Sequence, residues 1–172
     1  MRNRLVLTIL ICIILTLVAL VVLHPIFAPG MIVTDDGDWF VIRLSAFYQT
    51  FRDGQFPVRF LGRLNYNYGY PVANFLYPGF MYIGSIIHLF GVPFTATVEL
   101  LTVGSVILTS YFLYLWLSAL FPVFPATIGS MTYLLSPYLV YDIFRRGSIG
   151  EVMAGMFAAL SLASIERKWR PV

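Results

Sequence analysis

Long apolar runs separated by short polar stretches dominate this chain. The first run, from Leu5 to Leu23, has 19 residues without a charged side chain. As an α-helix it would be about 28 Å long, enough to cross the hydrocarbon core of a bilayer. Three later apolar runs are comparable. The pattern therefore predicts an all-α integral membrane protein with four transmembrane helices, at residues 5–25, 94–120, 125–144 and 151–166.

A fifth apolar stretch, residues 73–90, is weaker. Asn74, Pro78 and His88 interrupt it, and its continuous part is shorter than the roughly 20 residues that a span requires. We expect a short re-entrant or interfacial segment. The chain then has one large outer loop, residues 26–93, and a second outer loop, residues 145–150.

Basic residues near the two ends support this count. Arg2 and Arg4 precede the first run, and residues 167–170 include three more basic side chains. By the positive-inside rule both ends are cytoplasmic, so we expect a multi-pass protein of the plasma membrane with its N-terminus inside. This topology puts Arg145 and Arg146 outside, against the rule, where Asp142 and Glu151 are their candidate partners. A fifth crossing would instead leave the basic tail outside, so each topology breaks the rule once.

The large outer loop contains one clear helical pattern. Phe40, Leu44, Phe47 and Phe51 recur at i, i+4, i+7 and i+11, the spacing of one face of an amphipathic helix. We expect this helix to lie in the membrane interface with its aromatic face toward the lipid. Thr34 or Asp35 is the candidate N-terminal cap.

Composition excludes other classes of protein. The chain is 59% hydrophobic and 11% charged, whereas soluble domains carry about 25% charged residues. Disordered chains are poor in hydrophobic residues, and a net charge of +3 is too small for a nucleic-acid footprint. The expected partners are therefore membrane lipid and other transmembrane helices. The single cysteine excludes a disulfide framework.

The candidate chemistry lies in the two outer loops. Asp35, Asp36 and Asp38 are either a solvated helix start or a cluster that acts as a general base or binds a divalent metal. Glu151, three residues after Ser148, fits a capping box and can have a second role.

Arginines and aromatic residues follow in the large outer loop. Arg59 and Arg63 precede a tyrosine-rich stretch that contains Tyr68 and Tyr70. The rings are either a membrane-interface belt or the wall of a site for an amphiphilic ligand whose phosphate the arginines bind.

Several short motifs together resemble a known family. They are Asp36-Gly37 followed by Phe40 and Arg43, then Gly54-x-Phe56-Pro57, Tyr68-Gly69-Tyr70-Pro71-x-x-Asn74-Phe75-x-Tyr77-Pro78, and Arg146-Gly147-x-x-x-Glu151. This set is similar to the N-terminal part of the YfhO-like and 6-pyruvoyl-tetrahydropterin-synthase-related membrane proteins, which are grouped with the GT-C glycosyltransferases. A fainter likeness extends to the catalytic subunit of oligosaccharyltransferase, through Trp39-Phe40-x-x-Arg43 and Tyr77-Pro78-Gly79.

The resemblance implies a partial GT-C fold and an enzyme that transfers a sugar from a polyprenyl-phosphate-linked donor at the extracytoplasmic face. It implies that Asp36, with Asp35 and Asp38 as alternatives, and Glu151 are catalytic, and that Asp36 and Glu151 hold a divalent metal, Mg or Mn, if one takes part. Substrate contacts would come from Arg43, Arg59, Arg63, Tyr68, Tyr70 and Arg146. Members of the family have many more spans, so we expect residues 1–172 to be a single membrane domain, the N-terminal part of a larger protein, and inactive alone. The alternative is a non-catalytic membrane module that binds lipid or assembles with partner helices.

Overall fold

The computed structural model describes the backbone of residues 2–169 and the side chains of residues 5–166. Regular structure in this part of the chain is helical. Its elements are α1 (Arg2–Val22), η1 (His24–Phe27), α2 (Gly37–Arg52), η2 (Val72–Asn74), α3 (Gly79–Leu89), α4 (Phe94–Leu120), α5 (Val123–Leu134), α6 (Pro137–Tyr141), η3 (Asp142–Arg146) and α7 (Ile149–Trp169). Four segments are long and apolar enough to cross a membrane, namely Leu5–Val22, Phe94–Leu120, Val123–Arg146 and Ile149–Glu166. The expected number of candidate spans is therefore confirmed.

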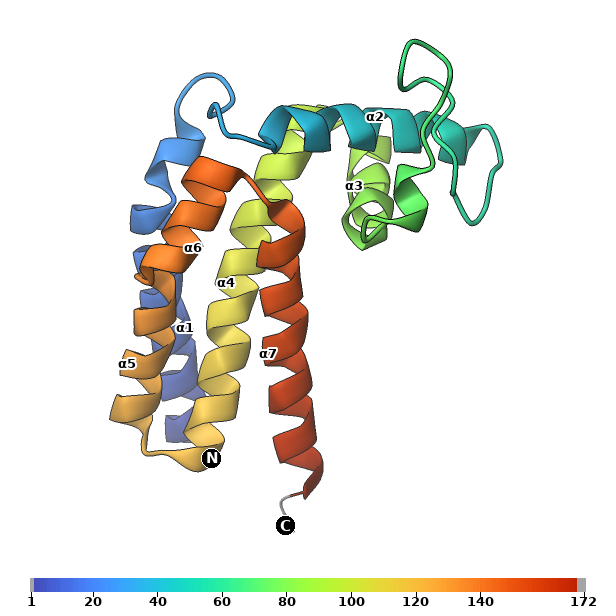
Figure 1. The fold of residues 1–172 in the computed structure, drawn as a ribbon. Coiled ribbons are helices and arrows are strands. Elements are labelled where there is room, and N and C mark those ends of the chain that lie inside the picture. The colour runs from blue at the N-terminus through green and yellow to red at the C-terminus, as the bar shows by residue number, and fades with distance from the viewer. Residues whose placement is uncertain (1, 170–172) are drawn as a thin grey trace.

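The four long segments form a bundle around α4, which contacts α1, α5 and α7 (Figure 1). Buried side chains such as Leu15, Val106, Tyr114 and Leu134 fill its core. The start of α1, the turn between α4 and α5 and the end of α7 lie at one end of the bundle. The turn between η3 and α7 lies at the other end. Both expected outer loops are therefore at the same end.

The third span differs from the continuous helix expected over residues 125–144. Its helix breaks at Leu135 and Ser136, and the chain continues as α6 and then as η3, a stretch of π-helix. Pro137 causes the break, because proline lacks a backbone N–H and disfavours the helical conformation of the preceding residue. The Ser136 hydroxyl accepts a hydrogen bond from the Leu139 backbone N–H (3.3 Å) and caps the new helix.

The large outer loop forms an arm that projects from one end of the bundle, with α2 along its length and α3 beneath α2 (Figure 1). Phe40, Leu44 and Phe47 of α2 are at most 3% exposed. Phe40 meets Phe80 edge-on with 5.3 Å between the ring centroids, and Phe47 meets Tyr82 at 4.7 Å. The predicted amphipathic helix exists, but its expected lipid-facing orientation is wrong, because α3 and α4 cover the aromatic face.

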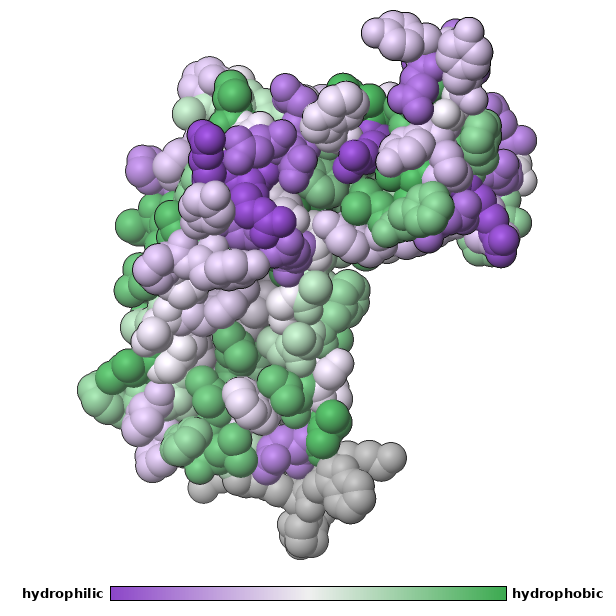
Figure 2. Space-filling view, viewed as in Figure 1, coloured by the Kyte–Doolittle hydropathy of each residue, from purple (hydrophilic) through white to green (hydrophobic). Residues whose placement is uncertain are grey.

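Surface polarity divides along the bundle. Figure 2 shows hydrophilic residues gathered at the end of the bundle beside the arm, with a mainly hydrophobic surface below them. On α1 the apolar side chains of Leu5, Ile9, Ile13 and Leu17 are exposed. Such a band suits a lipid environment, where apolar side chains replace the charged surface of a soluble protein.

Candidate functional site

The two loops that the sequence predicts to lie outside are joined through their backbones. The Asp35 N–H donates to the Arg145 carbonyl and the Asp36 N–H to the Arg146 carbonyl, both at 2.9 Å. Gly147 has a φ of +70°, and a Cβ atom at this position would overlap the Thr34 hydroxyl. We call this contact between residues 34–37 and 145–147 the loop junction. It brings the start of α2 to the start of α7.

Thr34 contacts the start of α2. Its hydroxyl accepts a hydrogen bond from the N–H of Gly37, the first residue of the helix, at 3.0 Å, but the N-cap position is Asp36 and neither of the two expected candidates. Asp36 occupies the position immediately before α2, and its side chain makes no capping hydrogen bond. Its carboxylate is left available to other groups.

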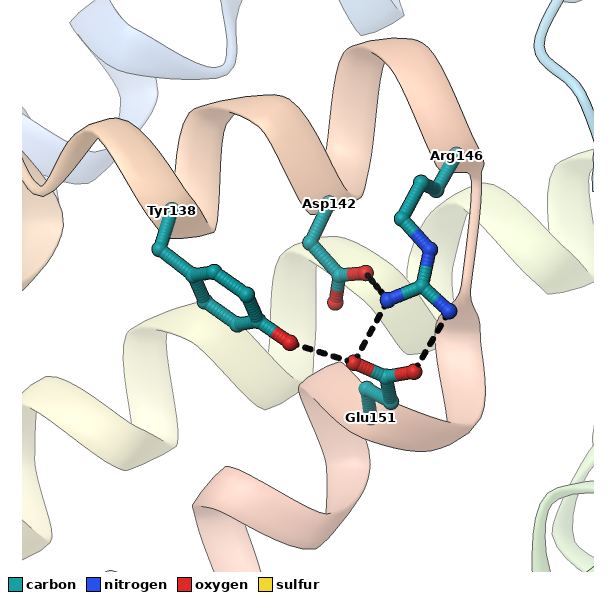
Figure 3. Close-up of polar contacts among 4 residues, drawn as sticks. All are labelled: Tyr138, Asp142, Arg146 and Glu151. Atoms are coloured by element: carbon teal, nitrogen blue, oxygen red, sulfur yellow. Dashed lines mark hydrogen bonds and ion pairs between the residues drawn. The ribbon is translucent and has the colours of Figure 1, made fainter.

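Beside the junction lies a carboxylate–arginine cluster of Tyr138, Asp142, Arg146 and Glu151 (Figure 3). Arg146 Nη1 is 3.2 Å from Asp142 Oδ1 and 2.8 Å from Glu151 Oε2, and Arg146 Nη2 is 2.7 Å from Glu151 Oε1. The Tyr138 hydroxyl donates to Glu151 Oε2 at 2.6 Å. Asp142 and Glu151 are thus confirmed as the partners of Arg146. The same expectation was wrong for Arg145, which pairs with Asp35.

Local sequence explains the geometry of the cluster. Tyr138, Asp142 and Arg146 follow one another at intervals of four residues, so their side chains lie on one side of α6 and η3. The Asp142 carbonyl accepts from the Gly147 and Ser148 N–H groups, and the left-handed Gly147 then turns the chain into α7. Glu151 in the first turn of α7 consequently faces Arg146.

Two details of the cluster differ from the sequence analysis. The expected capping box of Ser148 and Glu151 does not form, because the Glu151 carboxylate binds Arg146 and Tyr138 instead. Tyr138 was not predicted. The spacing of four residues between Tyr138 and Asp142 predicts that the two side chains share one side of a helix. It does not predict the contact with Glu151, which depends on how the chain turns into α7.

The charges of the cluster are partly buried. The Asp142 side chain is 3% exposed, and those of Arg146 and Glu151 are 36% and 37% exposed. With both acids ionised the cluster carries a net charge of −1. Glu151 Oε2 accepts hydrogen bonds from Tyr138 and Arg146, and Oε1 is ion-paired with Arg146. The cluster therefore holds the turn in place and leaves Glu151 little free capacity for proton transfer.

The three aspartates at the start of the arm have different surroundings. Asp35 pairs with Arg145 at 3.5 Å, with both side chains more than half exposed. Asp36 and Asp38 are exposed, and among the described residues no hydrogen bond or ion pair involves the Asp36 carboxylate. Of the three, Asp36 is directly tied to Arg146 at the loop junction.

Metal-binding potential is limited in the described part of the chain. Groups of three or more His, Cys, Asp or Glu side chains that could hold a metal ion do not occur there. Asp36 and Glu151 remain the predicted pair of metal ligands, and further ligands would have to come from substrate oxygens or water.

The remaining predicted substrate contacts lie on the arm. Arg43, Arg63 and Tyr70 line a common pocket of about 530 Å³. Arg59 and Tyr68 are exposed and do not line it. Arg146 lies apart from all of these, in the carboxylate–arginine cluster.

Comparison with known proteins identifies no relative: no protein-family model, curated protein or solved structure matches the chain. Its function must therefore be inferred from its own residues and their arrangement.

Proposed function

We propose that this chain contributes the extracytoplasmic acidic site of a membrane glycosyltransferase that takes a sugar from a polyprenyl-phosphate carrier. The observation that supports the proposal most directly is the loop junction, because it ties Asp36 to the segment that carries Arg146 and leads into Glu151. In this proposal the basic residues near both ends lie on the cytoplasmic side of the plasma membrane, as the positive-inside rule favours, and the junction lies outside. The rest of the active site would come from further helices of a longer parent or of a partner subunit.

In this proposal Asp36 is the general base. Its carboxylate is exposed and takes no part in capping α2, so it can accept the proton of an acceptor hydroxyl. The acceptor oxygen then bonds to the anomeric carbon of the donor sugar. The bond between that carbon and the carrier phosphate breaks, and the phosphate leaves with the electron pair. Asp35 and Asp38 flank Asp36 and are the alternative bases.

Arginines supply the contact for the leaving phosphate. Arg43, Arg59, Arg63 and Arg146 are the candidates, with Tyr68 and Tyr70 beside the arm arginines. Guanidinium groups bind phosphate through paired N–H donors and stabilise the charge that develops on it. A divalent metal, Mg or Mn, held by Asp36 and Glu151 would supply further charge stabilisation, and Glu151 would have to exchange its contacts with Arg146 and Tyr138 for the metal.

Substitution of Asp36 tests the proposal. We expect Asp36→Asn, in the complete membrane-embedded protein, to lower sugar transfer from a polyprenyl-phosphate donor at least 100-fold, since a positioned base contributes about 10²–10⁴-fold. The matched control is Asp53→Asn, which removes an exposed carboxylate at the far end of α2. Transfer by Asp36→Asn at the rate of the control would refute the role of Asp36.

A non-catalytic membrane module is the second candidate, and one observation favours it. Glu151 is saturated by Arg146 and Tyr138, as expected of a structural ion pair. Of the small residues of α7, Ala159 and Ala163 are buried within this chain, whereas Ala154 and Ala158 face outward and can contact another helix. Ala158→Leu should then disrupt assembly with a partner, as measured by cross-linking, while Asp36→Asn has no effect.

A further inference from the structure

The arm carries a pocket on its outer side that the acidic site does not use. Residues of α2 form one wall and the loop of residues 61–70 forms the other. The lining residues are Trp39, Ile42, Arg43, Arg63, Leu64, Asn65, Tyr66 and Tyr70, and the volume is about 530 Å³. We call it the arm pocket. Its size lies within the range of about 300–1,000 Å³ that is typical of small-molecule sites.

The loop that forms the outer wall is anchored to the arm. Leu61 and Tyr70 exchange two backbone hydrogen bonds of 2.9 and 3.1 Å, and the Leu61 side chain is fully buried in the core of the arm. The loop rises above α2 on the side away from the bundle (Figure 1). Its tip is therefore beyond the level of the predicted spans, where a ligand arrives from water.

Exposed aromatic rings line both walls. Trp39 of α2 is 55% exposed, and Tyr70 and Tyr66 of the loop are 39% and 97% exposed. Because the loop lies beyond the end of the bundle, Tyr66 and Tyr70 do not form a belt around the predicted membrane-spanning part. An aromatic face carries negative partial charge and attracts the weakly positive C–H groups on the face of a sugar ring.

Two uncompensated positive charges share the pocket. The Arg43 guanidinium lies 6.0 Å from the centre of the Trp39 ring, and Arg63 donates a hydrogen bond to the Gln49 side-chain oxygen. Among the described residues neither arginine has a carboxylate within ion-pair distance. Each guanidinium has five N–H donors, so most remain available to a carboxylate or phosphate on a ligand.

We propose that the arm pocket binds an anionic saccharide, with its sugar ring against Trp39 and Tyr70 and its acid group on Arg43 and Arg63. The inference rests on the proposed function and deepens it, since it identifies the chemical class of the acceptor. Arg59 then remains for the carrier phosphate, because Asp142 and Glu151 already occupy Arg146. The pocket thereby separates recognition of the acceptor from the acidic site at the loop junction.

Binding by the complete protein in phosphatidylcholine nanodiscs tests this assignment. The probes are a uronate hexasaccharide and a neutral hexasaccharide, compared by calorimetry. We expect binding of the uronate only, weakened about 10- to 100-fold by Arg43→Gln or Arg63→Gln, because hydrogen bonds to charged groups contribute about 1.5–3 kcal/mol. Trp39→Ala should weaken it by a smaller factor.

Arg52→Gln is the matched control. It removes the same charge from the same helix, but Arg52 lies over Tyr48 at 5.9 Å and does not line the arm pocket. Equal binding of the neutral probe, or equal weakening by Arg52→Gln, would overturn the proposal in favour of non-specific contact. Binding of a nucleoside diphosphate or of phosphatidylglycerol vesicles through Arg43 and Arg63, without binding of the uronate, would overturn it in favour of another ligand. Thermal unfolding shows whether each variant is folded.

The same variants separate this inference from the proposed function. If both are right, Asp36→Asn binds the uronate normally and transfers sugar at least about 100-fold more slowly. Transfer that depends on Asp36 without uronate binding would refute the assignment of the arm pocket alone. Uronate binding that depends on Arg43 together with unchanged transfer by Asp36→Asn would refute the role of Asp36 alone.

Discussion

Asp142 is the one buried charged residue among the described side chains. A buried carboxylate is costly unless a positive charge and hydrogen bonds compensate it, and Arg146 supplies both. Arg146 also binds Glu151 through two nitrogens. A single guanidinium therefore compensates the carboxylates of both Asp142 in η3 and Glu151 in α7. The stability of the turn between η3 and α7 should therefore depend on it.

We expect Arg146→Gln to lower the free energy of unfolding by about 3 kcal/mol, because it leaves the Asp142 carboxylate uncompensated. The double variant Asp142→Asn/Arg146→Gln should recover much of this loss, since it removes the buried charge as well. Arg145→Gln is the control, because its pair with Asp35 is exposed and such pairs contribute less than about 1 kcal/mol. Denaturant unfolding measures all three, and equal losses in Arg145→Gln and Arg146→Gln would contradict the role of the buried charge.

At the scale of elements, the loop junction depends on a glycine that the sequence alone does not distinguish from others. Gly147 and Gly91 both have positive φ values, +70° and +88°. A Cβ atom would meet nothing within 4 Å at Gly91, but it would overlap Thr34 at Gly147. Gly147 is therefore needed both for its left-handed backbone angle and for the close approach of the two loops. Gly91 is needed for its backbone angle alone.

Gly91→Ala should therefore cost about 1–2 kcal/mol of stability, the penalty of the left-handed conformation. Gly147→Ala should cost about 1 kcal/mol more, because Thr34 must move and its hydroxyl then loses the hydrogen bond that it accepts from the Gly37 N–H. A Thr34→Gly background removes both the hydroxyl and the Cβ that the new side chain would meet. In that background the extra cost of Gly147→Ala should shrink, which is the non-additivity expected of residues in contact. Additive losses in thermal unfolding would show that the two loops do not touch.

At the scale of the whole molecule, the arm is packed against one end of the bundle. The buried residues of the arm, including Phe40 and Met81, form a common cluster with Val98 of α4 and Met153 of α7. Tyr77 adds a contact, because its ring lies where a side chain on Gly150 would be. The acidic site and the arm pocket are consequently on the same side of the predicted membrane.

Side-specific labelling tests this arrangement. In a Cys12→Ser background, single cysteines at Asp53 and Arg145 should react with a membrane-impermeant thiol reagent from outside the cell. A cysteine at Phe121, in the turn between α4 and α5, should react only after the membrane is opened. All three positions are exposed. Reaction of the Arg145 position from the side of Phe121 would exclude a shared site and favour the membrane module.

Much of the architecture could be predicted from sequence. The four spans follow from runs of apolar residues, and α2 follows from the spacing of Phe40, Leu44, Phe47 and Phe51. Both signals are local, because helical rise and periodicity depend on a few neighbouring residues. The orientation of α2 was predicted wrongly, since an aromatic face packs equally well against lipid or against another helix.

The sequence by itself determined the class of the protein, the number of its candidate spans and the two loops in which its polar chemistry lies. Only the tertiary structure decided that Asp36 joins Arg146 through the backbone, that Tyr138 completes the cluster around Glu151, and that Arg43 and Arg63 share a pocket while Arg59 does not. These are contacts between residues far apart in the chain or on loops without periodicity. Which residues meet in these contacts depends on how α2, α4 and α7 pack together. A local sequence pattern does not specify this packing.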